Sequence, residues 1–122
     1  MIYIVEDDRG WESYYRRTFG GYEVEVFHDG IAAITAMDEE VPKLVILDVL
    51  LTGPTGFAVL NEMHSYPELA RVPVIIVSSV GFSSDDAEAL GKYGVVKVLD
   101  KASMTPRELL GAVKSYYGGE HD

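Results

Sequence analysis

The chain has 122 residues, 48% of them apolar and 25% charged, which is the composition of one globular domain rather than of a disordered or fibrous protein. Ten basic residues against 20 acidic ones give a net charge of −10, and this argues against direct binding of nucleic acid or anionic lipid. Cysteine is absent, which excludes disulfides, thiolate metal sites and cysteine nucleophiles.

The first residues are Met-Ile-Tyr-Ile-Val followed by three acids, so the basic start and apolar stretch of a signal peptide are missing. No apolar run approaches the roughly 20 residues needed to span a bilayer. We therefore expect a cytoplasmic domain without membrane insertion. We expect the domain to cover residues 1–118, with 119–122 as a tail or the start of a linker.

Five short runs rich in β-branched residues predict five strands, at Ile2–Val5, Val24–Phe27, Leu44–Leu47, Val74–Val77 and Val95–Leu99. The second run alternates between polar and apolar residues, which is typical of an edge strand with one wet face. The other four lack this alternation, which predicts strands buried on both faces of a parallel sheet.

Segments with helical periodicity separate the strands, and five helices are predicted from the apolar residues of 11–19, 31–37, 57–63, 87–93 and 109–116. The last helix has the clearest start, with Thr105 as its cap, Pro106 in its first turn and Glu108 closing a capping box. Strands and helices in alternation predict a three-layer α/β/α domain with a parallel sheet.

In such a sheet, sites form beyond the carboxyl ends of the strands. Polar residues follow four of the five predicted strands: Glu6, Asp7 and Asp8; Asp48; Ser78 and Ser79; Asp100 and Lys101. An acid at one strand end is commonly a turn or cap residue. Four strand ends with carboxylates, hydroxyls and an amine instead indicate a functional site.

Asp48 interrupts the apolar run Leu-Val-Ile-Leu-Asp-Val-Leu-Leu, where an isolated charge is costly to bury. Glu6 and Asp7 nearby would add like-charge repulsion, and a divalent cation would relieve both costs. Oxygen ligands alone suit Mg²⁺, which often shares its coordination shell with a phosphate. Lys101 would then offer a charge, and Ser78 a hydroxyl donor, to a phosphoryl oxygen.

The chain resembles the receiver domain of bacterial two-component response regulators over essentially its whole length. The matching stretches are Ile2-Tyr-Ile-Val-Glu-Asp-Asp8, Leu44-Val-Ile-Leu-Asp-Val-Leu-Leu-Thr-Gly-Pro-Thr-Gly56, Pro73-Val-Ile-Ile-Val-Ser-Ser79 and Lys97-Val-Leu-Asp-Lys101. The resemblance implies a flavodoxin-like fold with strand order 2-1-3-4-5.

The resemblance also implies roles for single residues. Asp48 matches the phosphoacceptor, which takes a phosphoryl group from a sensor histidine kinase or a histidine phosphotransfer protein. Glu6 and Asp7 match the acidic pair that binds Mg²⁺, with the backbone carbonyl of Leu50 as a further ligand. Lys101 matches the lysine that contacts the phosphoryl group. Ser78 matches the hydroxyl that turns toward it on activation.

A domain of this family is a signalling phosphoacceptor that catalyses its own phosphorylation and dephosphorylation, rather than an enzyme with a separate substrate. The resemblance implies output through a downstream protein partner or a further effector domain, with the receiver as a monomer or weak dimer. The cognate kinase, the pathway and the output do not follow from these residues.

The sequence departs from the family pattern at three positions. Val98 stands where the family usually has an aromatic switch residue, Ala102 replaces the proline after the lysine, and Thr52 replaces the proline four residues after the phosphoacceptor. Without the proline after Lys101, the peptide bond between Lys101 and Ala102 need not be cis. We expect Asp48 to be phosphorylated. Because of Val98, we expect its coupling to the fourth predicted helix and the fifth predicted strand to be weaker or differently built.

Three alternative functions need other residues at the strand ends or make no use of the phosphoacceptor chemistry. A receiver-like interaction module that acts independently of phosphorylation is favoured by Val98 and Ala102, and opposed by the complete set of site residues. A flavin-binding domain would need a hydroxyl- and glycine-rich phosphate loop in place of Glu6-Asp7-Asp8. A haloacid-dehalogenase-type phosphatase would need an acid where Leu50 stands.

Overall fold

We describe a computed structural model of the chain, for residues 1–49, 56–79 and 84–117. The strands are β1 (Ile2–Val5), β2 (Val24–Phe27), β3 (Leu44–Asp48), β4 (Val74–Ser78) and β5 (Val95–Asp100). The helices are α1 (Gly10–Thr18), α2 (Gly30–Met37), α3 (Gly56–His64), α4 (Pro67–Ala70), α5 (Ser84–Gly91) and α6 (Pro106–Tyr116). The five predicted strands are confirmed, three of them one residue longer than predicted.

All strands are parallel, and they form a single sheet in the order β2-β1-β3-β4-β5. This order confirms the flavodoxin-like architecture, because the chain moves outward in both directions from the neighbouring strands β1 and β3. The pairing places Asp48 opposite Val77 and Ser78 opposite Asp100. The carboxyl ends of β3, β4 and β5 therefore lie at the same edge of the sheet.

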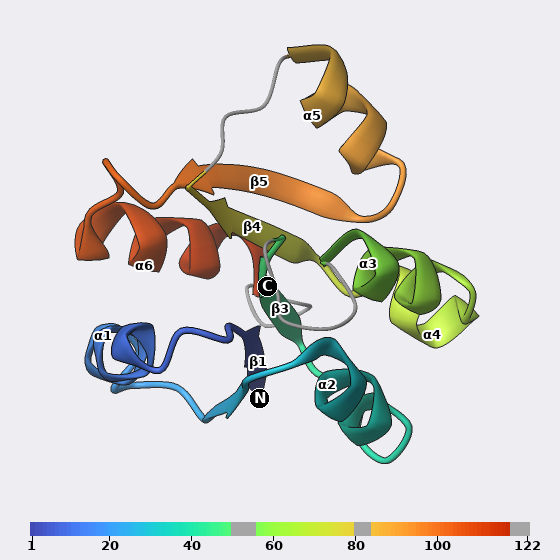
Figure 1. Ribbon diagram of the computed structural model, residues 1–122, viewed down its shortest axis with the longest axis horizontal. Helices are drawn as coiled ribbons and strands as arrows, with labels where there is room; N and C mark the ends of the chain where they lie inside the picture. Colours follow the sequence, from blue (N-terminus) through green and yellow to red (C-terminus); the bar gives the residue numbers. More distant parts are fainter. Residues whose placement is uncertain (50–55, 80–83, 118–122) are drawn as a thin grey trace.

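Helices cover both faces of the sheet (Figure 1), with α1 and α6 on one side and α2, α3 and α4 on the other. Alternate residues of β1 separate the two cores: Ile2 and Ile4 pack with α1 and α6, whereas Tyr3 and Val5 pack with α2 and α3. Leu90 of α5 joins the second core. The central strands are buried on both faces, which explains their continuous apolar sequence.

Two expectations need correction. The run Val95–Leu99 was predicted to be buried on both faces, but β5 is the second edge strand, and Val96 is 37% exposed. A sheet with five strands has two edge strands. Because β5 is rich in valine, its sequence does not show the alternation that indicates an edge strand. The short helix α4 was not predicted, because its four residues hold too few apolar positions to show a helical period.

Local signals explain where the helices begin. Asp29 accepts a hydrogen bond from the backbone N–H of Ala32 at 2.8 Å and caps α2. The predicted cap of α6 is confirmed, since the Thr105 hydroxyl accepts the N–H of Glu108 at 3.1 Å. At the far end of α6, the hydroxyl of Tyr117 accepts a hydrogen bond from the amino group of Met1 at 3.0 Å. The residue before β1 and the residue after α6 thus meet at the amino-terminal edge of the sheet, opposite the edge where Asp48 lies.

Candidate functional site

The candidate site is built from the carboxyl ends of three strands. Asp48 is the last residue of β3, Glu6 directly follows β1, and Lys101 directly follows β5. The backbone N–H of Lys101 donates to the carbonyl of Ser78 at 2.9 Å, which ties the end of β5 to the end of β4. Side chains 42 to 95 positions apart in the sequence are thereby held at one edge by the backbone ladder.

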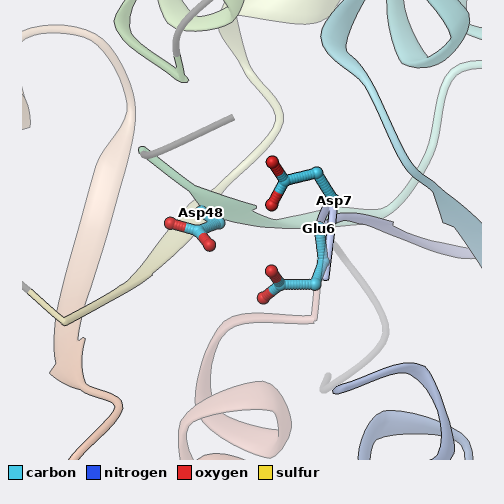
Figure 2. A group of neighbouring side chains, drawn as sticks. All are labelled: Glu6, Asp7 and Asp48. Atoms are coloured by element: carbon cyan, nitrogen blue, oxygen red, sulfur yellow. The ribbon is translucent and has the colours of Figure 1, made fainter. Parts of the chain in front are cut away.

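Three carboxyl groups gather there, from Glu6, Asp7 and Asp48. One oxygen of each lies within 4.8 Å of the others. Figure 2 shows Glu6 and Asp7 reaching from the end of β1 toward the side on which Asp48 lies. Glu6 and Asp48 are only 1% and 5% exposed, and Asp7 is half-buried. Carboxylates held so close together, and largely away from water, need a cation.

Lys101 supplies part of that positive charge. Its Nζ lies 2.6 Å from Oε1 of Glu6 and 2.7 Å from Oδ2 of Asp48. When all four groups are ionised, one amine faces three carboxylates, so the cluster keeps excess negative charge. This donor set of hard oxygens with uncompensated charge fits a divalent ion such as Mg²⁺.

The ionisation of the cluster reflects its burial. Burial raises the pKa of Glu6 to about 7; the hydrogen bond from Lys101 opposes this rise, and the neighbouring carboxylate of Asp48 adds to it. Burial alone would lower the pKa of Lys101, but its hydrogen bonds to Asp48 and Glu6 outweigh that effect and raise it. The amine is therefore a firmly protonated cation, whereas Glu6 gains or loses its proton near neutral pH.

Two aromatic residues of α1 also contact the cluster. The Tyr15 hydroxyl donates to Oε1 of Glu6 at 3.2 Å, and the Trp11 ring centroid lies 4.9 Å from Nζ of Lys101. In the sequence, both residues count only as apolar positions of the helix predicted from residues 11–19. The available signal was their position four and eight residues after Asp7 with a spacing of four, which places both on one helix face near the acidic turn.

The turn before α1 has its own structural role. The side chain of Asp8 accepts the N–H of Gly10 at 2.9 Å, where the helix begins, and its backbone N–H donates to Oε2 of Glu6 at 3.3 Å. Asp8 thus shapes the turn, while Glu6, Asp7 and Asp48 form the carboxylate group. His28 contacts the backbone carbonyl of Glu6 through Nδ1 at 3.0 Å, so its ring supports the turn from β2.

The remaining predicted residues differ in burial, and some of them lie outside the described residues. Ser78 is fully buried at the end of β4, and Ser79, which is exposed, lines the hollow above the cluster together with Asp48 and Lys101. No cis peptide bond occurs in the described ranges, so the bond between Lys101 and Ala102 is trans, which the absence of the proline allows. Leu50 and Thr52 lie outside the described residues.

Val98 of β5 is half-buried and packs against the core on the side of α2 and α3. Its side chain therefore takes part in packing at the sheet edge. The expectation of weaker coupling through this position stays a prediction.

Comparison with known proteins identifies the class to which this fold and site belong. The family model of the response regulator receiver domain matches residues 2–114, so the chain belongs to this family. It is a receiver domain of the two-component, phosphorylation-based signalling type.

Relatives and solved structures agree with this assignment. The transcriptional regulatory protein GltR of Pseudomonas aeruginosa is 33% identical over 120 residues, which cover 93% of this chain and 47% of GltR. The polar-differentiation response regulator DivK of Brucella anthropi is 28% identical over 119 residues, covering 96% of this chain and 95% of DivK. The Mn²⁺-bound form of response regulator Rcp1 shares the fold, with a TM-score of 0.78 and 22% identity over 99% of this chain and 96% of that one.

The chain spans about half the length of GltR. In the part of the chain that the structure describes, no helix is long and apolar enough to cross a membrane.

Proposed function

We propose that Asp48 accepts a phosphoryl group from a phosphohistidine of a sensor histidine kinase or a histidine phosphotransfer protein. A carboxylate oxygen of Asp48 forms a bond to phosphorus while the phosphorus–nitrogen bond to the donor imidazole breaks. The product is an acyl phosphate, and the released imidazole takes a proton from solvent. The contact of Lys101 with both Asp48 and Glu6 is the observation that carries this proposal.

The reason is electrostatic. A carboxylate attacks an anionic phosphoryl group poorly unless positive charge offsets the repulsion, so positioning and charge carry most of the catalysis. Lys101 already lies 2.7 Å from Oδ2 of Asp48, where it can hold a phosphoryl oxygen. The hydroxyl of Ser78, at the neighbouring strand end, is proposed to donate to the same group.

Glu6, Asp7 and Asp48 would hold Mg²⁺, with the backbone carbonyl of Leu50 as a proposed fourth protein ligand. When bound, the ion supplies positive charge that offsets the charge of the carboxylates and the phosphoryl group. Support comes from the excess negative charge of the cluster and from its purely oxygen donors. The fold neighbour Rcp1 was solved with Mn²⁺, an ion that prefers the same ligand chemistry.

Phosphorylation also explains how the domain can signal. The new group brings further negative charge and three acceptor oxygens to an edge where Ser78 and Lys101 lie. These contacts exist only in the phosphorylated state, and such a difference is what shifts a conformational equilibrium. We propose output through a downstream protein or an effector domain, in the cytoplasm, from a receiver spanning residues 1–118 as a monomer or weak dimer.

The test is the intact mass of the protein after incubation with a small acyl phosphate and Mg²⁺. One added phosphoryl group is expected, lost in Asp48→Asn and without metal. Autocatalysis follows if the adduct forms with no kinase present. If rapid quenching shows no adduct while Mg²⁺ binds, the proposal is wrong, and the chain acts as a receiver-fold interaction module.

A further inference from the structure

The side of α1 that faces the sheet contributes two contacts to the carboxylate cluster. Trp11 and Tyr15 are four residues apart, so they lie one above the other on the same face of the helix. Their ring centroids are 6.0 Å apart. Trp11 contacts the amine of Lys101, and Tyr15 contacts the carboxylate of Glu6. One helix face therefore touches both members of the buried ion pair.

The hydrogen bonds of Glu6 show why the Tyr15 contact matters. Oε1 of Glu6 accepts from Nζ of Lys101 at 2.6 Å and from the Tyr15 hydroxyl at 3.2 Å. Oε2 lies 3.3 Å from the backbone N–H of Asp8. Because Glu6 is only 1% exposed, water cannot readily replace a donor that is lost. The position of this carboxylate thus depends on a small number of protein donors.

The amine of Lys101 also contacts a second carboxylate, that of Asp48. The Lys101 Nζ lies 2.7 Å from Oδ2 of Asp48. On the proposed function, on which this inference rests, phosphorylation of Asp48 places three anionic oxygens beside that amine. A lysine that turns toward them weakens its contact with Glu6. The Tyr15 hydroxyl donates to Oε1 of Glu6, so it can hold that oxygen when the lysine turns away.

We propose that Tyr15 is a positioning residue for the metal site. Its hydroxyl holds the Glu6 carboxylate in the orientation needed for Mg²⁺, and it continues to do so when Lys101 serves the phosphoryl group. Donors behind a metal-ligating carboxylate act in this way, because a carboxylate that is not held must be ordered when the metal binds. The Trp11 ring lies against the amine from the same helix and limits where Lys101 can move.

The chain contains a matched control in the adjacent residue. Tyr14 packs edge-on against both Trp11 and Tyr15, with ring centroids 5.1 Å and 5.7 Å apart. Its hydroxyl is buried, yet it makes no hydrogen bond within the described structure. Tyr14→Phe and Tyr15→Phe therefore remove the same atom from neighbouring positions of one helix. Only the second removes a donor to the metal site.

The experiment is a Mg²⁺ titration of the whole chain, followed by the fluorescence of Trp11, the single tryptophan. We expect the Mg²⁺ dissociation constant to rise about tenfold in Tyr15→Phe, at the lower end of the usual effect of such donors. Tyr14→Phe is expected to stay within about twofold of the unsubstituted chain. Equal affinities in the two variants would overturn the proposal, and so would a chain that binds no Mg²⁺ at all.

A measurement on the unsubstituted protein covers the case in which Tyr15→Phe folds poorly. Nuclear magnetic resonance is expected to show a slowly exchanging hydroxyl proton for Tyr15 that persists at saturating Mg²⁺. Loss of that signal on adding Mg²⁺ would show that the hydroxyl leaves Glu6, and would contradict the positioning role.

Neither readout requires phosphoryl transfer, so the two proposals can fail separately. A chain with the Tyr15 effect but no adduct on Asp48 would sink the proposed function alone. A chain that is phosphorylated, with equal Mg²⁺ affinity in both tyrosine variants, would sink only the role of Tyr15.

Discussion

The two helical layers of the domain contact the sheet with different kinds of side chain. On the side of α2 and α3, the core is made mainly of aliphatic residues and methionines, such as Val59, Leu60 and Met63. On the side of α1 and α6, Tyr15 and Phe19 are fully buried, with Trp11 and Tyr14 beside them. Both layers bury apolar surface, but among the residues that the structure describes, the helix α1 of the second layer places polar aromatic groups against the carboxylate cluster.

Because the two faces differ in this way, the sheet can be stabilised from both sides while one side also contacts the candidate site. Aliphatic packing is indifferent to the chemistry at the strand ends, whereas a tyrosine or tryptophan offers an apolar body with a polar tip or a charge-binding face. The side of α2 and α3 should therefore affect mainly stability. The side of α1 and α6 should affect both stability and the site.

The largest expected effect tests the aliphatic side. Leu60→Ala removes a fully buried side chain of α3 and should lower the free energy of unfolding by about 3–4 kcal/mol, through lost burial and the cavity left behind. Urea unfolding measures this loss. The phosphorylated fraction of the folded protein should stay unchanged at low temperature. A specific fall in that fraction would contradict the division between the two sides.

Gly56 is expected to be an exception to this division between the two sides, because it begins α3 yet lies against the backbone of Asp48. A Cβ at Gly56 would lie 2.5 Å from the Cα of Val49 and 2.7 Å from the carbonyl oxygen of Asp48, and backbone atoms must move to admit it. Gly56→Ala should lower the free energy of unfolding by about 3 kcal/mol, at the upper end of the usual cost of overpacking a core.

The same substitution should also slow phosphorylation, since it shifts the strand end that carries Asp48. Thermal unfolding and the rate of adduct formation measure the two effects. Gly21→Ala is the control, because a Cβ there meets nothing within 4 Å. Normal phosphorylation in a destabilised Gly56→Ala would show that the strand end tolerates the shift.

The next effect concerns pH in the absence of metal. The folded state holds the proton of Glu6 more tightly than the unfolded state, because its pKa rises from 4.5 to about 7. The unfolding free energy should therefore fall as the pH rises from 4.5 to 7 and level off above, by about 3 kcal/mol in total. The raised pKa of Lys101 acts only above pH 10.5 and leaves this window unaffected.

Denaturant unfolding at a series of pH values, with a chelator present, measures the slope. Glu6→Gln removes the titrating group and should flatten the curve over the same range. A stability that rises between pH 4.5 and 7 in the unsubstituted chain would contradict the upward direction of the Glu6 pKa.

The smallest effect concerns the outer surface of α6, away from both cores. Gly111 lies inside this helix, is exposed, and leaves open space for a Cβ. Gly111→Ala should raise the unfolding free energy by about 0.5–1 kcal/mol, because alanine loses less conformational freedom in a helix. Thermal unfolding measures the gain. Mg²⁺ affinity should not change, and a change would show that α6 is coupled to the site through its backbone.

Much of the fold could be predicted from the sequence, because apolar periodicity reflects burial directly. The strand beginning at Leu44 is visible as a continuous apolar run, and Asp48 stands out because it ends that run. The edge position of β5 could not be seen. Its residues Val95, Val96 and Val98 are all apolar, while only the pairing shows that β4 is its single neighbour.

The carboxylates and Lys101 could be placed at one edge because parallel strands end together. Their ion pairs could not be predicted, because a lysine at a strand end can also face solvent. The Tyr15 contact was hidden for a physical reason. A tyrosine in a helical stripe satisfies the apolar pattern with its ring, and the pattern says nothing of where its hydroxyl lies.

The hydrogen bond from the amino group of Met1 to the Tyr117 hydroxyl, at 3.0 Å, has a practical consequence for optical experiments. Both ends of the described chain lie at the edge of the sheet that is remote from Asp48. Dyes attached at these two ends should transfer energy efficiently in the folded domain and lose that transfer on unfolding. Phosphorylation should leave the transfer almost unchanged, so such a labelled chain would report folding separately from signalling.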